Sequence, residues 1–229
     1  MNKTLTTIFA LAIASLAAFA QAQDAKGDIM QGEKKASMCI GCHGIVGYQA
    51  SFPEVYKVPK ISGQNAGYIV SALSAYKAGE RKHPTMRGVA TSLSDQDMAD
   101  LAAFYSQHGV QTGVVVAPVV ETNAAGDTKY LVSDRFAELL KKGNCTACHG
   151  ANLNSPVAPN QPKIAGQYAD YLYASLKAYK TENNTIIGRN NAIMGAQVKA
   201  FTLAELRELA YFIGQRDGNL RTVPQSRFR

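Results

Sequence analysis

The sequence contains one short cysteine–histidine stretch twice, as Cys-Ile-Gly-Cys-His at 39–43 and as Cys-Thr-Ala-Cys-His at 145–149. Two thiols three positions apart lie on one side of a helical turn, from which both reach neighbouring vinyl groups of a haem. The imidazole that follows then points at the iron. The spacing therefore predicts two covalently bound haem c groups. The residues predicted to hold them are all four cysteines of the chain and the adjacent histidines, Cys39, Cys42, His43, Cys145, Cys148 and His149.

Disulfide bridges and structural zinc are the alternatives for these cysteines. Two disulfides would leave the paired histidines unexplained. Each zinc site would need two further ligands, and the other histidines of the chain, His83 and His108, both lie in its first half. The second motif could not complete a zinc site by itself, so haem is preferred.

Residues 1–22 have the pattern of a secretory signal peptide. A short basic start at Met1–Lys3 precedes an uncharged apolar run over 5–18, and small residues at 18, 20 and 22 offer cleavage sites. No later segment reaches membrane-spanning length. We therefore expect the mature protein to work outside the cytoplasm.

The similarity between the two halves extends well past the motifs. Pro-Lys-Ile-Ser-Gly-Gln at 59–64 recurs as Pro-Lys-Ile-Ala-Gly-Gln at 162–167. Further pairs follow in the same order, Tyr68 with Tyr171, Tyr76 with Tyr179, Arg81 with Arg189, and Met86 with Met194. Such a repeat predicts two homologous domains, 23–109 and 129–229, joined by a linker over 110–128.

Each half reads as three helices, and no stretch alternates convincingly as a strand. The first helix leads into the motif, over about 29–38 and 135–142, and the second follows the Gly-Gln pair. The third opens with a capping box, Ser94 with Asp97 and Thr202 with Glu205. The fold class is therefore all-α, with two tandem cytochrome c-like domains.

Methionine is the predicted second axial ligand in both halves. Only Met86 and Met194 occupy equivalent positions, in the predicted loop between the second and third helices. A thioether in the sixth position closes the iron to substrates and raises its reduction potential. Met98 is better explained by core packing. His83 is a rival ligand in the first half, but its repeat partner is asparagine.

Two further repeated pairs are candidates for the surroundings of the haems. The backbone carbonyls of Pro59 and Pro162 are candidate acceptors for the second imidazole N–H, although these prolines could equally shape a turn. Arg81 and Arg189 are candidates to bind a haem propionate through their forked guanidinium groups, or are surface residues.

The positive charge gathers in the second half. Residues 23–109 carry nine basic and eight acidic residues, 9 − 8 = +1, whereas residues 129–229 carry fourteen and seven, 14 − 7 = +7. Such a gradient orients the molecule towards an acidic partner or an anionic membrane surface, so we expect redox partners and allow for peripheral membrane association. A nucleic-acid partner does not suit an exported protein with this signature.

The joint pattern resembles the dihaem cytochrome c4 family, over essentially all of the mature chain. The resemblance rests on tandem Cys-x-x-Cys-His-Gly motifs, each with a Pro-Lys-Ile-x-Gly-Gln segment and a distal methionine. It implies a bilobal periplasmic monomer with approximate twofold symmetry, methionine–histidine ligation, and electron transfer with a cytochrome oxidase or a quinol-oxidising complex. One departure is the longer connection over 43–59, whose Tyr48, Phe52 and Tyr56 we expect at the domain interface or at a docking surface.

The predicted function is therefore that of a soluble or membrane-associated electron shuttle without catalytic residues. The first alternative is the cytochrome subunit of a dehydrogenase complex, such as a sulfide-oxidising flavocytochrome. The second is a small dihaem enzyme, which would need one iron with an open or exchangeable position.

Overall fold

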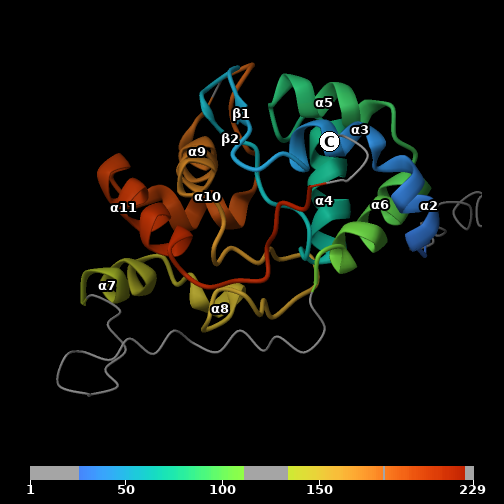
Figure 1. Cartoon of the computed structure of the whole chain (residues 1–229). Coiled ribbons are helices and arrows are strands. Elements are labelled where there is room, and N and C mark those ends of the chain that lie inside the picture. The colour runs from blue at the N-terminus through green and yellow to red at the C-terminus, as the bar shows by residue number, and fades with distance from the viewer. Residues whose placement is uncertain (1–25, 111–133, 183, 225–229) are drawn as a thin grey trace, which may run out of the picture.

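The computed structural model describes residues 26–110, 134–182 and 184–224. The predicted signal peptide, nearly all of the predicted linker, and the terminal arginines at 227 and 229 lie outside the described residues. Within them the chain forms two helical lobes that lie side by side (Figure 1). We call residues 26–110 the first lobe and the described residues from 134 to 224 the second lobe.

The two lobes have the same helix order, which confirms the predicted all-α fold. Each described lobe has five helices rather than three. In the first lobe they are α2 (Ile29–Lys35), α3 (Ser37–His43), α4 (Ala66–Lys77), α5 (Pro84–Thr91) and α6 (Asp95–Gln107). In the second they are α7 (Asp134–Lys142), α8 (Thr146–His149), α9 (Ala169–Lys180), α10 (Ala192–Lys199) and α11 (Leu203–Gly214). No described helix is long and apolar enough to span a membrane.

The helix predicted over 29–38 is two helices. The chain leaves α2 at Ala36 and re-enters a helix as α3, which carries the first motif. Helix α2 crosses α6 closely, because a Cβ atom at Gly32 would lie 2.0 Å from the Asp100 carbonyl oxygen. Only glycine permits this approach. The crossing places the start of α3 over the core of the first lobe.

The predicted capping boxes open α6 and α11. The Ser94 and Thr202 hydroxyls accept from the amides of Asp97 and Glu205, whose carboxylates accept from the cap amides in return. Both helices then bury one apolar face, with Leu206 completely buried in α11. They pack on α4 and α9 respectively, and these pairs form the cores of the two lobes.

The longer connection of the first lobe contains two short strands, which the sequence analysis did not expect. Strands β1 (Gln49–Ala50) and β2 (Tyr56–Lys57) pair in antiparallel register, with Gln49 opposite Lys57. They lie next to α9 of the second lobe (Figure 1). The strands are too short for an alternating pattern to be visible in the sequence.

The repeated Pro-Lys-Ile-x-Gly-Gln segments meet at the interface between the lobes. The Lys60 amide donates to Gln167 Oε1 (3.0 Å), and the Lys163 amide donates to Gln64 Oε1 (2.9 Å). In return, Gln167 Nε2 donates to the Lys60 carbonyl (2.8 Å), and Gln64 Nε2 donates to the Lys163 carbonyl (2.9 Å). The lysine ammonium groups reach glycine carbonyls of the other lobe (2.6 and 2.7 Å). The interface is therefore reciprocal, as approximate twofold symmetry requires.

A second reciprocal contact joins the lobes further along the chain. Arg81 and Arg189 form an antiparallel β-bridge. Two backbone hydrogen bonds flank it, from Lys82 N to Gly188 O (2.9 Å) and from Asn190 N to Glu80 O (2.8 Å).

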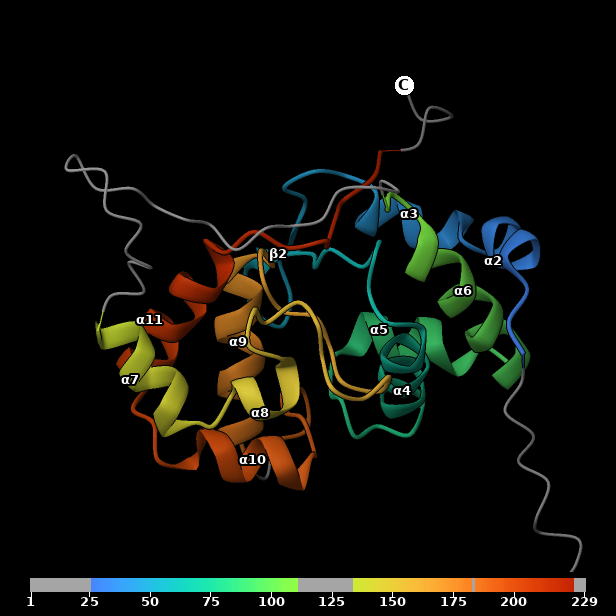
Figure 2. The same cartoon turned by 90° about the horizontal axis from the view of Figure 1, so that it is seen from below.

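The segment after α11 leaves the second lobe and runs to the first (Figure 2). Its Arg221 amide donates to the Ser62 carbonyl over 2.9 Å. This backbone contact is a further link between the two lobes.

Candidate haem sites

Each motif lies at the carboxyl end of a helical turn. Helix α3 carries Cys39, Cys42 and His43, and α8 carries Cys148 and His149 directly after Cys145. All four cysteines are free thiols. The helical turn places the two thiols of each motif on one side, as the spacing predicted. The described residues contain no cluster of three or more His, Cys, Asp or Glu side chains that could hold a metal ion.

Both motif histidines are oriented by a proline carbonyl. His43 Nδ1 lies 2.8 Å from the Pro59 oxygen, and His149 Nδ1 lies 2.8 Å from the Pro162 oxygen. These hydrogen bonds fix the ring orientation and leave Nε2 of each imidazole for a ligand. Burial lowers the pKa of both histidines and outweighs the opposing effect of the carbonyl. Burial thus favours the neutral imidazole, which is the form that binds a metal.

The two equivalent methionines lie in short helices, and the prediction that they occupy loops is wrong. Met86 lies in the first turn of α5, and Met194 lies in the first turn of α10. The His83 and Asn191 side chains cap these helices, accepting from the Met86 and Met194 amides (3.3 and 2.9 Å). Pro84 in the first turn of α5 was a local signal of this helix.

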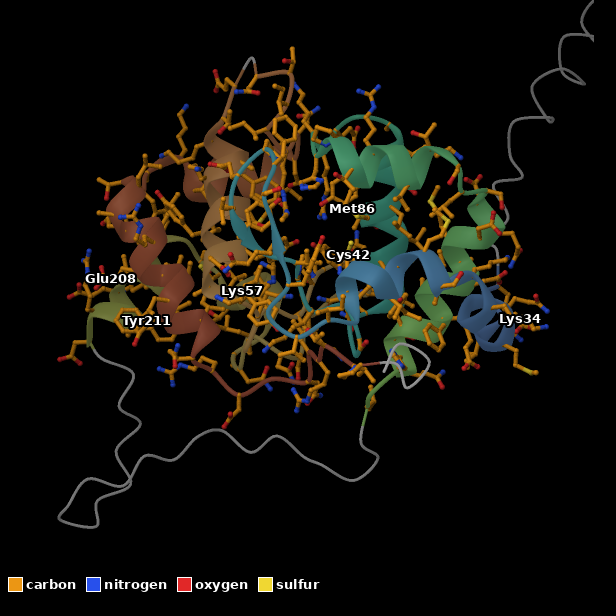
Figure 3. The ribbon with its side chains drawn as sticks, turned by 45° about the horizontal axis from the view of Figure 1, so that its top comes forward. Lys34, Cys42, Lys57, Met86, Glu208 and Tyr211 are labelled. Atoms are coloured by element: carbon orange, nitrogen blue, oxygen red, sulfur yellow. The ribbon has the colours of Figure 1, made fainter. Side chains whose placement is uncertain are left out.

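The other methionines of the first lobe have different surroundings. Met98 on α6 is 1% exposed and fills the core, as predicted. Met30 and Met38 are 70% and 67% exposed. Met86 is half-buried, and Figure 3 labels it and Cys42 on α5 and α3 of the first lobe. Among the described methionines of this lobe, Met86 is thus the one that is neither exposed nor part of the core.

The donor set of each lobe fits a covalently attached haem. Two free thiols, one neutral imidazole with a free Nε2 and one half-buried thioether are the groups that haem c uses for attachment and axial ligation.

A cationic cluster of two arginine side chains lies between the lobes. Arg81 donates to the Tyr68 hydroxyl (3.0 Å), and Arg189 donates to the Tyr171 hydroxyl (3.1 Å). No ion pair joins either guanidinium to a carboxylate of the described chain. Burial raises the pKa of Tyr171, but the two guanidinium groups outweigh this and hold it below its ordinary value. The cluster therefore has the charge to accept an anionic group.

Comparison with known proteins agrees with this donor set. The cytochrome c family profile matches residues 29–108 and 134–217, which include both motifs. Cytochrome c4 from Azotobacter vinelandii is 32% identical over 200 residues, which cover 83% of this chain and 88% of that protein. The chain belongs to the dihaem cytochrome c4 family. It is therefore an electron-transfer protein with two covalently bound haem c groups.

Two further similarities bear on the fold and the partner of this cytochrome c4 family member. The structure of reduced recombinant cytochrome c4 from Pseudomonas stutzeri has a TM-score of 0.57 and 27% identity, covering 83% of this chain and 100% of that chain. The thiosulfate dehydrogenase electron acceptor of Stutzerimonas stutzeri is 30% identical over 212 residues, covering 90% of this chain and 94% of that protein.

Sequence reasoning missed the role of the repeated lysines and glutamines at the interface. Gln64 and Gln167 are each 4% exposed, and they bind the other lobe's Lys163 and Lys60. The available signal was a polar pair repeated inside an otherwise apolar segment. A buried amide side chain needs a hydrogen-bonding partner, and here the partner is the other copy of the segment.

Proposed function

We propose that this electron carrier works in the periplasm as a shuttle whose two irons are both closed to substrates. The observation that carries the proposal is the repeated pairing, in which each lobe supplies one motif histidine and one half-buried methionine at equivalent positions. Bound haem supplies reversible one-electron chemistry between ferrous and ferric iron. Export rests on the signal-peptide pattern of residues 1–22, and amino-terminal sequencing of the mature protein tests it.

In this proposal the chain holds each haem by defined groups. Cys39 and Cys42 in the first lobe, and Cys145 and Cys148 in the second, form the thioethers. His43 and His149 bind iron through Nε2, since the proline carbonyls occupy Nδ1. Met86 and Met194 would supply the second ligand of each iron. Because both ligands come from helices anchored in the core, little needs to rearrange when the charge on the iron changes.

Carbon monoxide tests the closed sites. The reduced protein should not bind it, and both ferric haems should show the methionine-to-iron charge-transfer band. Met86→Ala and Met194→Ala should each remove about half of that band and admit one carbon monoxide per protein. Met98→Ala is the matched control and should keep the whole band. Ready binding to the unsubstituted protein would instead favour a small dihaem enzyme.

Arg81 and Arg189 are proposed to bind haem propionates at the interface. The support is a pair of guanidinium groups that contact tyrosines and form no ion pair with a carboxylate of the described residues. Arg81→Lys keeps the charge but removes the fork, so it should lower the reduction potential of the first haem less than Arg81→Gln does. Equal potentials in both variants and the unsubstituted protein would contradict this role.

The physiological partner is proposed to be a respiratory redox protein such as a terminal oxidase. A second candidate is a thiosulfate dehydrogenase, because one relative is named as the electron acceptor of such an enzyme. Stopped-flow mixing separates the two. Oxidation of the reduced protein by an oxidase supports the first, and reduction of the oxidised protein by thiosulfate dehydrogenase with thiosulfate supports the second. The +7 charge of the second half predicts that reaction with an acidic partner slows as salt rises.

A further inference from the structure

The longer connection of the first lobe extends across to the second lobe. The path from the motif histidine to its proline acceptor spans 16 positions in the first lobe and 13 in the second. The first-lobe connection includes the β1–β2 pair. A further hydrogen bond, from the Val58 amide to the Tyr48 carbonyl (2.8 Å), extends this pairing by one residue on each side. We call residues 49–58 the strap. Figure 3 shows Lys57 of the strap between the two lobes.

The strap contacts α9 at two points two turns apart. The Lys57 amide donates to Asp170 Oδ2 (3.0 Å), and its ammonium group pairs with the same oxygen (3.3 Å). The Glu54 carboxylate forms an ion pair with the Lys177 ammonium group. Seven residues separate Asp170 from Lys177, which is about 10 Å along one face of the helix. The strap therefore runs alongside the helix instead of touching it at one end.

An aromatic contact lies between the two ion pairs. The Tyr56 ring lies 6.0 Å from the Tyr171 ring, centroid to centroid. Tyr171 is also the residue whose hydroxyl accepts from Arg189. The strap thus packs directly against the cationic cluster between the lobes.

The opposite side of the interface has no equivalent of these ion pairs in the described chain. The repeat aligns Asp170 with Gly67 and Lys177 with Ser74. A Cβ atom at Gly67 would lie 2.8 Å from the Pro159 carbonyl oxygen, so the second connection meets α4 by backbone contact. The Gln161 carbonyl accepts from Asn65 there (2.9 Å). Within the described residues these charged contacts lie on one side of the interface, whereas the lysine–glutamine contacts of the two Pro-Lys-Ile-x-Gly-Gln segments are reciprocal.

We propose that the strap positions the second lobe against the first and thereby maintains the haem separation on which electron transfer between the lobes depends. Glu54 and Lys57 are its positioning residues. The inference rests on the proposed shuttle function, in which electrons pass between the lobes. Partly exposed ion pairs of this kind each shift an equilibrium by roughly two- to fivefold, so the strap biases docking without locking it.

Charge reversal in the full-length holoprotein tests the strap. Glu54→Lys places two ammonium groups together, and Lys57→Glu places two carboxylates together. Hydrogen exchange of the Lys82 and Asn190 amides measures opening, because each donates to a carbonyl of the other lobe. Each variant should accelerate exchange of both amides by about fivefold. The Leu206 amide, bonded within its own lobe, should be unaffected.

Two further variants isolate the contact. Glu54→Lys combined with Lys177→Glu restores the ion pair with reversed sign, so exchange should return to the original rate. Glu33→Lys makes the same charge change on the exposed surface of α2 and should have no effect. Unchanged exchange in both strap variants, or equal acceleration in Glu33→Lys, would overturn the proposal.

Electron transfer between the lobes provides the second readout. After rapid reduction of one haem, equilibration with the other should slow in Glu54→Lys and recover in the reversed pair, with both methionine charge-transfer bands intact. If amide hydrogen exchange accelerates in Glu54→Lys while electron equilibration between the two haems keeps its original rate, the positioning role is refuted. Loss of reversible reduction in the unsubstituted protein would contradict the shuttle function, and the exchange result would still report on docking.

Discussion

Gln64 provides the sharpest test of how the lobes are held together. Its side chain is 4% exposed, donates to the Lys163 carbonyl and accepts from the Lys163 amide, both over 2.9 Å. Gln64→Ala removes both hydrogen bonds and leaves both backbone groups of Lys163 without these partners in the docked state. Each of the two backbone groups left without its partner costs about 1.5 kcal/mol, so docking should weaken by about 3 kcal/mol. That corresponds to roughly 150-fold more opening.

Hydrogen exchange of the Lys82 and Asn190 amides measures this opening, since the exchange rate scales with the open population. Gln167→Ala removes the reciprocal bonds and should accelerate exchange to a similar extent. Gln31→Ala, on the exposed surface of α2, is the control and should leave both rates unchanged. If Gln64→Ala does not accelerate exchange, or if only one of the two glutamines matters, the reciprocal network is not what holds the lobes.

Three further predictions concern the stability of the lobes. Leu206→Ala should lower the free energy of unfolding of the second lobe by about 3 kcal/mol in a denaturant titration, because the side chain is completely buried; a change below about 1 kcal/mol would contradict the assigned core. Thr202→Ala removes the cap of α11 and should cost about 1 kcal/mol, whereas Thr202→Ser should be nearly neutral; equal losses would mean that the hydroxyl does not cap. Asp100→Asn tests a buried carboxylate whose pKa burial raises, although hydrogen bonds, above all from Lys35, outweigh this and hold it below its ordinary value. Since the folded-state pKa is the lower one, the carboxylate stabilises the first lobe above about pH 4 and this stabilisation is lost as the pH falls through the folded pKa. The variant should therefore show a weaker loss of stability in acid than the unsubstituted protein, and identical pH profiles would refute the assignment.

The sequence by itself was enough for the features that depend on neighbouring residues. Two thiols and an imidazole in five positions specify a haem attachment whatever surrounds them, and a hydroxyl three residues before a carboxylate specifies a helix start. Because the sequence repeats, each feature identified in one half could be assigned to the equivalent residues of the other half. It also selected Met86 and Met194 from the six methionines, because a ligand shared by both domains must recur at the same place.

Local structure was less predictable where it depends on a residue far away in the sequence or where the element is only two residues long. The close crossing of α2 over α6 depends on Gly32 meeting a carbonyl nearly seventy positions away, and the strands of the strap contain two residues each. The short helices of Met86 and Met194 had visible caps in His83 and Asn191. His83 also has the side chain of a possible metal ligand, so its residue type alone does not distinguish a cap from a ligand.

Only the tertiary structure decided how the two halves meet. The Pro-Lys-Ile-x-Gly-Gln segments read as haem surroundings, and each proline carbonyl does contact a motif histidine. The lysine and glutamine of the same segments bind the other lobe, and the strap reaches α9 across more than a hundred positions of sequence. The sequence around a polar side chain does not indicate its distant hydrogen-bonding partner, because that partner depends on how two folded surfaces dock. Spacing along the chain thus predicted which groups hold the cofactors, while the association of the two folded lobes determined how the two motifs are positioned relative to each other.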